Sequence, residues 1–156
     1  VLWGFSLFGS MALRREQTIY ITLWYFIATF VAISALYIFN NLSIPTYFVS
    51  GVGSILHSIS FYAGTNDAMI QWWFGHNAVA FVFTSGIIGI IYYFLPKESG
   101  QPIFSYKLTL FSFWGLMFVY IWAGSHHLIY STVPDWMQTM GSIFCCFDFT
   151  LLGNRD

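Results

Sequence analysis

Four side chains capable of metal or redox chemistry lie in two strongly apolar stretches of the sequence. His76 is in the string WWFGHNAV, and Tyr120, His126 and His127 are in the string YIWAGSHH. An imidazole deep in a membrane is costly unless it binds another group, and such residues often mark a functional site. Three imidazoles that leave a coordination position open suit copper, iron or zinc, whereas magnesium and calcium prefer oxygen ligands. The sequence therefore predicts a transition-metal site.

A simpler interpretation of the same histidines stays open. His126 and His127 could cap their helix near the membrane surface, and His76 could hydrogen bond to a neighbouring backbone group. Spacing alone does not decide between this structural role and metal binding.

The composition is typical of an integral membrane protein. Of the 156 residues, 58% are hydrophobic, 22% are aromatic and only 7% are charged, which excludes a soluble globule with a charged surface. The formal net charge is -1, and because there is no basic stripe to neutralise phosphates, no nucleic-acid partner is expected. Cys145 and Cys146 are adjacent, so they give neither a disulfide framework nor a metal-binding spacing.

Long apolar runs predict an all-α fold, a polytopic bundle of transmembrane helices. A helix needs about 20 apolar residues to cross the hydrocarbon core. Residues 18–39, 68–95 and 106–130 supply three such runs. Residues 1–13 are apolar but too short, and another apolar segment begins at 137 and then fails. We therefore expect three full spans and two partial ones.

The basic residues predict the orientation, since Lys and Arg are retained on the cytoplasmic side. Arg14, Arg15, Lys97 and Lys107 all belong to the two connections on one side of the membrane. The other two connections contain no Lys or Arg, so we expect them to face outward.

This orientation places the three histidines at matching depth. His76 lies about seven residues from the outer end of its span, and the adjacent histidine pair lies about as far from Pro134. At about 1.5 Å per residue, all three are then roughly 10 Å below the outer surface. Neighbouring helical positions point about 100° apart, so the pair can share an ion only at the helix edge. Gly124 and Ser125 provide the small volume that permits this approach to the partner helix.

Three longer strings identify a family. YAGTNDAMIQWWFGHNAVAF, YYFLPKESGQPIFSY and FVYIWAGSHHLIYSTVPDWMQ resemble the catalytic subunit of the cbb(3)-type cytochrome c oxidases, members of the haem-copper oxidase superfamily. The resemblance runs from residue 1 to about residue 144, and the histidine pair, the upstream tyrosine and the GHN string keep the family's order. It implies that residues 1–144 are part of a twelve-helix transmembrane subunit.

The resemblance implies roles for the site residues. His76, His126 and His127 would hold the copper B ion that faces a high-spin haem. Tyr120 would be the redox tyrosine, joined covalently to the first of these histidines, which supplies an electron and a proton when the dioxygen bond is cleaved. The implied reaction is oxidation of cytochrome c by O2, giving water and coupled to proton translocation. Thr84 could join a proton path, although a helical threonine more often hydrogen bonds to its own helix.

The chain departs from the family pattern at the haems. The family binds a low-spin and a high-spin b-type haem through histidines on other helices. The fourth histidine here, His57, lies in a predicted outer loop and is a poor candidate for either role. We therefore expect the copper ligands without the haem axial ligands, and an isolated chain that is inactive.

The last residues form a second departure. Residues 145–156, CCFDFTLLGNRD, place Asp148, Arg155 and Asp156 where the family continues as an apolar helix. Suitable codons for this string, read one nucleotide later, encode an apolar sequence like the expected helix. We interpret residues 145–156 as a non-homologous, frameshifted tail, and resequencing the coding DNA near codon 145 tests this.

Two other functions stay open at this point. A nitric oxide reductase of the same superfamily uses non-haem iron and nearby glutamates, whereas Glu16 and Glu98 lie in predicted cytoplasmic loops and Tyr120 favours an oxidase. The second alternative is a noncatalytic membrane fragment that binds metal weakly or not at all. By resemblance, the partners are membrane lipid, c-type cytochrome subunits and cytochrome c, with O2 as substrate, in the bacterial inner membrane.

Overall fold

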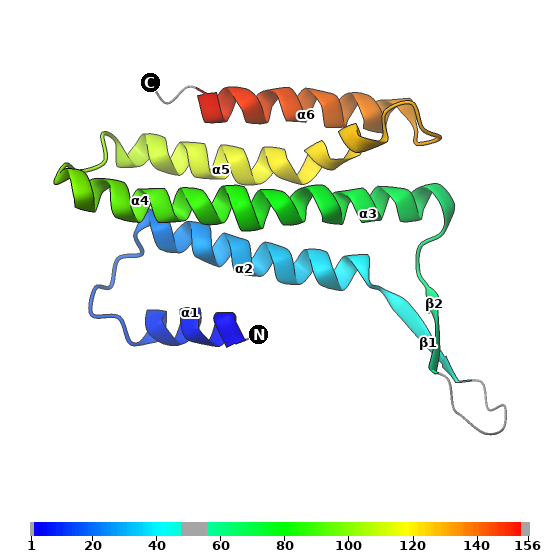
Figure 1. Ribbon diagram of the computed structural model, residues 1–156, viewed down its shortest axis with the longest axis horizontal. Helices are drawn as coiled ribbons and strands as arrows, with labels where there is room; N and C mark the ends of the chain where they lie inside the picture. The colour runs from blue at the N-terminus through cyan, green and yellow to red at the C-terminus, as the bar shows by residue number, and fades with distance from the viewer. Residues whose placement is uncertain (1, 48–55, 154–156) are drawn as a thin grey trace.

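The protein is a row of antiparallel helices with a small hairpin at one end (Figure 1). The structure, a computed structural model, describes residues 2–47 and 56–153, with side chains at 2–44 and 58–147. Asp148, Arg155 and Asp156 of the expected tail therefore lie outside the described side chains. The six α-helices are α1 (Leu2–Ala12), α2 (Ile21–Asn40), α3 (Gly64–Val79), α4 (Gly86–Ser99), α5 (Tyr106–Ala123) and α6 (Asp135–Gly153).

Three helical stretches of the described residues are long and apolar enough to cross a membrane. They are Ile21–Asn40, Gly64–Ser99 and Tyr106–Leu128, so the three predicted full spans are confirmed and the chain is a multi-pass membrane protein. α1 is apolar but shorter, as expected for a partial span. α6 is helical to Gly153 but is not among the candidate spans of the described residues, as expected for the second partial span, because polar residues reduce its apolarity without ending the helix.

The second span contains a π-helical turn, η1 (Ala80–Ser85), between α3 and α4. Such turns often accompany functional sites in helices. The Thr29 hydroxyl of α2 lies 2.8 Å from the Tyr25 carbonyl oxygen, 2.9 Å from the Phe81 carbonyl oxygen and 3.2 Å from the Ser85 hydroxyl. Thr29 and Ser85 are both buried. This hydroxyl cluster therefore ties the π turn to the first span.

The apolar core lies where α2, the second span and α5 meet. Tyr25 is completely buried there, and its ring stacks on Tyr92 with centroids 5.7 Å apart and meets the edge of Phe113 at 5.0 Å. Aromatic pairs in these geometries stabilise helix packing beyond the area that they bury. Gly89 permits the approach, because a Cβ atom there would lie 3.0 Å from the Cβ of Tyr25.

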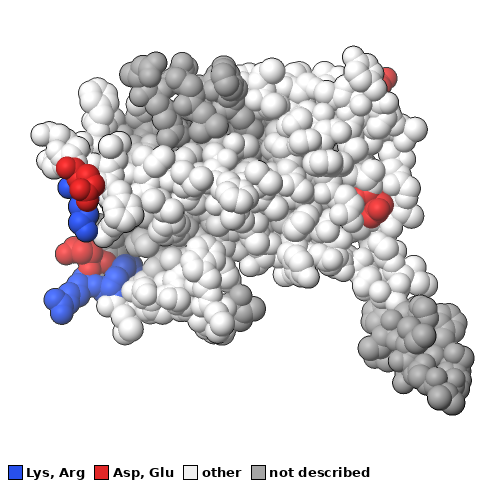
Figure 2. Space-filling model, viewed as in Figure 1, with Lys and Arg blue, Asp and Glu red and all other residues white. Residues whose placement is uncertain are grey.

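The positive charges gather at one end of the bundle (Figure 2). Gly100, with a left-handed φ of 66°, caps the C-terminal end of α4. Ser105 caps the N-terminal end of α5, because its Oγ accepts a hydrogen bond from the Leu108 N–H at 3.3 Å. This turn brings Lys97 and Lys107 to the end that also carries the α1–α2 connection. The described Lys and Arg residues thus share one side of the membrane, as the predicted orientation requires.

The opposite end carries an antiparallel hairpin that the sequence analysis did not predict. β1 (Ser43–Tyr47) pairs with β2 (Leu56–Ser60), and Ile44 faces Ile59 across the ladder. Each strand has one isoleucine, and the two form a cross-strand pair of β-branched side chains, which favours strand pairing. The all-α class therefore holds for the membrane part, and the hairpin projects beyond it (Figure 1). His57 belongs to β2, and its side chain is outside the described residues.

Candidate metal centre

The two histidine-bearing elements arrive from opposite directions. α3 carries His76 in its last turn, and α5 continues into a 3-10 helix, η2 (Gly124–Leu128), which carries His126 and His127. α3 begins at Gly64, four residues before the predicted span, so His76 lies about 18 Å along the helix axis from its start. The sequence estimate of its distance from the outer helix end was therefore too short.

The three imidazoles converge on one point. The ring centroid of His76 is 5.0 Å from that of His126 and 5.6 Å from that of His127, and the last two are 4.3 Å apart. One ring nitrogen from each lies within 4.8 Å of the others. Imidazole nitrogens bind transition metals at about 2.0–2.1 Å, so a shared ion would need these rings to close in slightly. The arrangement is that of a three-histidine site.

Close backbone approach brings η2 to α3. A Cβ atom at Gly124 would lie 2.8 Å from the carbonyl oxygen of Trp72 and 3.3 Å from Trp73 Cα, so only glycine fits at this distance. Gly124 thus has the role that the sequence predicted. Ser125 does not have this role. Its hydroxyl donates to the Met137 carbonyl oxygen at 2.6 Å and so faces α6 instead of α3.

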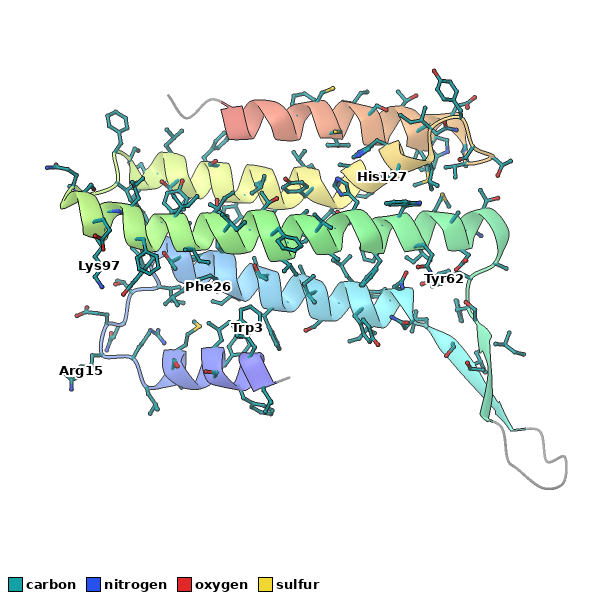
Figure 3. The ribbon with its side chains drawn as sticks, in the orientation of Figure 1. Trp3, Arg15, Phe26, Tyr62, Lys97 and His127 are labelled. Atoms are coloured by element: carbon teal, nitrogen blue, oxygen red, sulfur yellow. The ribbon has the colours of Figure 1, made fainter. Side chains whose placement is uncertain are left out.

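Two neighbouring side chains contact the imidazoles and restrict their orientation. His127 lies where η2 faces α3 (Figure 3). Its ring stacks on the indole of Trp72, which belongs to α3. His76 Nδ1 lies 3.1 Å from Asn77 Oδ1, and the Asn77 amide donates to the Ile121 carbonyl oxygen of α5 at 3.3 Å. Asn77 is completely buried. Groups of this kind orient ligands and tune a metal site.

One imidazole nitrogen of the site is an unsatisfied buried polar atom. His126 Nδ1 is buried and has no hydrogen-bond partner among the described residues. A buried polar atom without a partner is costly, and coordination to a metal ion would satisfy it. Neither this atom nor His76, which bonds a side chain, makes the backbone hydrogen bond of the simpler interpretation. The donor set therefore fits a transition metal better than a structural role.

Tyr120 and Thr84 form a second polar contact beside the histidines. The Tyr120 hydroxyl donates to Thr84 Oγ1 at 3.3 Å, and its ring centroid is 5.8 Å from that of His76. Thr84 belongs to the π turn η1, so this turn presents it to α5. The structure thus brings all five predicted site residues into one neighbourhood.

Sequence reasoning missed Trp72 and Asn77 as supports of the site. The signals were present, since Trp72 is four residues before His76, on the same helical face, and Asn77 is the next residue along the chain. What spacing could not indicate is the direction of η2, which decides that Trp72 meets His127.

Comparison with known proteins identifies relatives over most of the chain. A family model described as Cytochrome C and Quinol oxidase polypeptide I matches residues 1–147. The chain is 45% identical over 143 residues to the Cbb3-type cytochrome c oxidase subunit CcoN1 of Stutzerimonas stutzeri. It is also 45% identical over 143 residues to the cytochrome c oxidase subunit 1 of Rhodobacter capsulatus. Both alignments cover 92% of the chain.

A third relative gives the same result. The bacteroid cytochrome c oxidase subunit 1 homolog of Bradyrhizobium diazoefficiens is 47% identical over 131 residues, which are 84% of this chain. The chain spans only 29%, 26% and 23% of the lengths of these three relatives. It therefore corresponds to less than a third of each subunit.

Proposed function

Because this chain belongs to the cytochrome c and quinol oxidase polypeptide I family, we propose that it supplies the copper-binding part of the catalytic subunit of a terminal respiratory oxidase. This enzyme reduces O2 to water with electrons from cytochrome c and couples the reaction to proton translocation. The observation that carries the proposal is the convergence of ring nitrogens from His76, His126 and His127 within 4.8 Å.

Each site residue has a role in this proposal. The three imidazoles would hold one copper ion, and a copper ion held there would supply one-electron chemistry for O2 reduction. Tyr120 provides a further electron and a proton from its phenol, because its ring lies next to His76. Thr84 accepts the phenol's hydrogen bond and leads toward the cytoplasmic half of the helix, where a proton path would enter.

The cofactors and partners follow from the family. Membership implies haem and copper cofactors, a membrane location and other oxidase subunits. We propose that b-type haems complete the reaction centre and that their axial ligands are not among the four histidines of this chain. The isolated chain would then not reduce O2. We further propose c-type cytochrome subunits as electron donors and the bacterial inner membrane as the location.

A nitric oxide reductase is not favoured. The relatives found are named as cytochrome c oxidase subunits. Glu16 lies in the α1–α2 connection and Glu98 in the last turn of α4, at the charged end of the bundle and away from the histidines. The ring of Tyr120 lies beside His76, with centroids 5.8 Å apart, which supports its proposed role as the redox phenol.

The division of the chain at residue 144 also belongs to this proposal. Residues 1–144 would form the oxidase part, and residues 145–156 would be the frameshifted tail. A coding sequence without a shifted frame near codon 145 would overturn that division.

Copper content tests the proposed function directly. The detergent-extracted chain is loaded with copper and compared with a variant carrying His126→Ala and His127→Ala, and with a His57→Ala control. We expect one copper ion per chain in the wild type and the control, loss of this ion in the double variant, and no haem absorption bands in any sample. Equal copper in all three samples would refute the three-histidine site, and absence of copper from all three would make the chain a noncatalytic membrane fragment.

A further inference from the structure

α6 contains no histidine, yet its backbone touches the segment that carries two of them. Gly141 is the point of contact. A Cβ atom built on Gly141 would lie 2.5 Å from the backbone nitrogen of His126 and 2.9 Å from the carbonyl carbon of Ser125. These are backbone atoms of η2, which cannot swing away as a flexible side chain could. The approach of α6 to the ligand segment therefore depends on the missing side chain at this position.

A hydrogen bond fixes the same approach. The Ser125 hydroxyl donates to the Met137 carbonyl oxygen at 2.6 Å. Met137 lies one helical turn before Gly141, so both contacts fall on the same face of α6. Because Ser125 directly precedes His126, this hydrogen bond fixes the position of η2 along the axis of α6.

Both ends of this part of α6 are anchored. Phe144 contacts Phe118 and Trp122 of α5, with ring centroids 6.4 Å apart in each pair. Gln138 holds the preceding turn, because its amide donates to the Val133 carbonyl oxygen at 2.6 Å and its Oε1 accepts from the Tyr130 N–H at 2.8 Å. α6 thus cannot follow η2 freely when η2 moves.

On its other side η2 packs against α3, where Gly124 lies close to the Trp72 carbonyl oxygen. The ligand segment is consequently held between two helices, with a glycine at each contact. His126 is the residue next to the α6 contact, and its Nδ1 is the buried nitrogen without a hydrogen-bond partner among the described residues. Because this nitrogen makes no hydrogen bond in the described protein, the placement of the ring depends on the η2 backbone and on ring contacts with His76 and His127.

We propose that Gly141 and Ser125 are positioning residues for His126, and that α6 sets the distance between the imidazoles of His126 and His76. The effect on copper binding rests on the proposed function, whereas the contacts of Gly141 and Ser125 with η2 do not depend on it. A methyl group at Gly141 would push η2 from α6 toward α3, where Gly124 leaves no room.

The test substitutes one glycine at a time. Gly141→Ala is compared with Gly9→Ala, since a Cβ atom at Gly9 would meet nothing within 4 Å. Both variants are made in the complete chain. We expect Gly141→Ala to weaken copper binding about 10- to 100-fold, the usual effect of disturbing a ligand's support, and Gly9→Ala to leave it unchanged. Equal copper affinity in the two variants would overturn the proposal.

A measurement without metal separates this proposal from the proposed function. The chain has four histidines, so histidine-labelled NMR gives a small set of ring signals, and the His126 signal is identified by its loss in His126→Ala. We expect Gly141→Ala to shift the His126 signal and Gly9→Ala to leave it in place. A shifted signal in a chain that binds no copper would support the positioning role while refuting the copper site, and an unshifted signal would refute the positioning role.

Ser125 provides the second variant if Gly141→Ala does not fold. Ser125→Ala removes the hydroxyl without adding volume, and Ser125→Thr restores a hydroxyl donor. We expect the alanine variant to shift the His126 signal and lower copper affinity, and the threonine variant to recover both in part. An alanine variant identical to the wild type in both measurements would contradict the proposal.

Discussion

The indole of Trp72 lies parallel to the imidazole of His127, with ring centroids 4.2 Å apart and 11° between the planes. Trp72 stands one turn before His76 on α3, so one helix supplies a ligand and the surface against which another ligand rests. Stacking of this kind restricts rotation of the imidazole about its χ2 angle. The order of the site therefore comes from aromatic packing as well as from the ligands themselves.

Replacing Trp72 with leucine should loosen His127 without removing a ligand. Loss of one stacked aromatic pair costs about 1 kcal/mol, which corresponds to roughly a fivefold weaker copper affinity. Competition with a chelator of known affinity measures the change. Trp136→Leu is the control, because Trp136 is 64% exposed and lies outside the site. An equal loss in both variants would show that the stacking has no specific effect.

The hydroxyl cluster at the π turn makes a prediction about stability. Thr29→Val removes the hydroxyl that lies against the Tyr25 and Phe81 carbonyl oxygens, and we expect a loss of about 1–3 kcal/mol in the free energy of unfolding. Thr22→Val is a matched control in the same helix, because Thr22 Oγ1 is buried but has no partner among the described residues.

The control should be neutral or stabilising, since it removes an unsatisfied polar atom. Both variants are unfolded thermally in the same detergent. If Thr22→Val destabilises the chain as much as Thr29→Val does, the hydrogen bonds to the π turn are not the cause of the loss.

A double-mutant cycle measures the contact between Tyr120 and Thr84. Tyr120→Phe and Thr84→Val each remove one partner of the hydrogen bond at 3.3 Å, and the double variant removes both. We expect a coupling of about 0.5–1.5 kcal/mol in the free energy of unfolding, the usual net value of one hydrogen bond. Strictly additive effects would mean that the two hydroxyls do not interact, and the suggested start of a proton path would be lost.

The orientation in the membrane can be tested with reporter fusions. A periplasmic reporter such as alkaline phosphatase should be active when it is inserted in the hairpin between β1 and β2, and inactive at Gly100. The reason is the position of Arg14, Arg15, Lys97 and Lys107 at the Gly100 end. The reverse pattern would place the histidines on the cytoplasmic side of the membrane centre and contradict the predicted topology.

The membrane helices could be predicted from the sequence because a span needs only length and apolarity. Ile21–Asn40 and Tyr106–Leu128 fall within a few residues of their predicted bounds. The π turn at Ala80–Ser85 could not be predicted, because its stabilisation comes from Thr29 on another helix. The hairpin was missed for a similar reason, since Ile44 and Ile59 pair across a long separation in sequence.

The candidate site could be predicted in its residues but not in its support. His76, His126, His127 and Tyr120 stand out in the sequence because polar rings are rare in apolar spans. Gly141 does not stand out, because a glycine in a helix has many possible reasons. Its contact with the His126 backbone exists only in the folded chain.

Counting the imidazoles bound to copper tests the central claim most directly. Pulsed electron paramagnetic resonance of the copper-loaded chain reports how many imidazole nitrogens are coupled to Cu(II). The three-histidine site predicts three coupled imidazoles in the wild type and in His57→Ala, and fewer in His76→Ala, because His76 alone comes from the other span. The same count in His76→Ala as in the wild type would contradict the account.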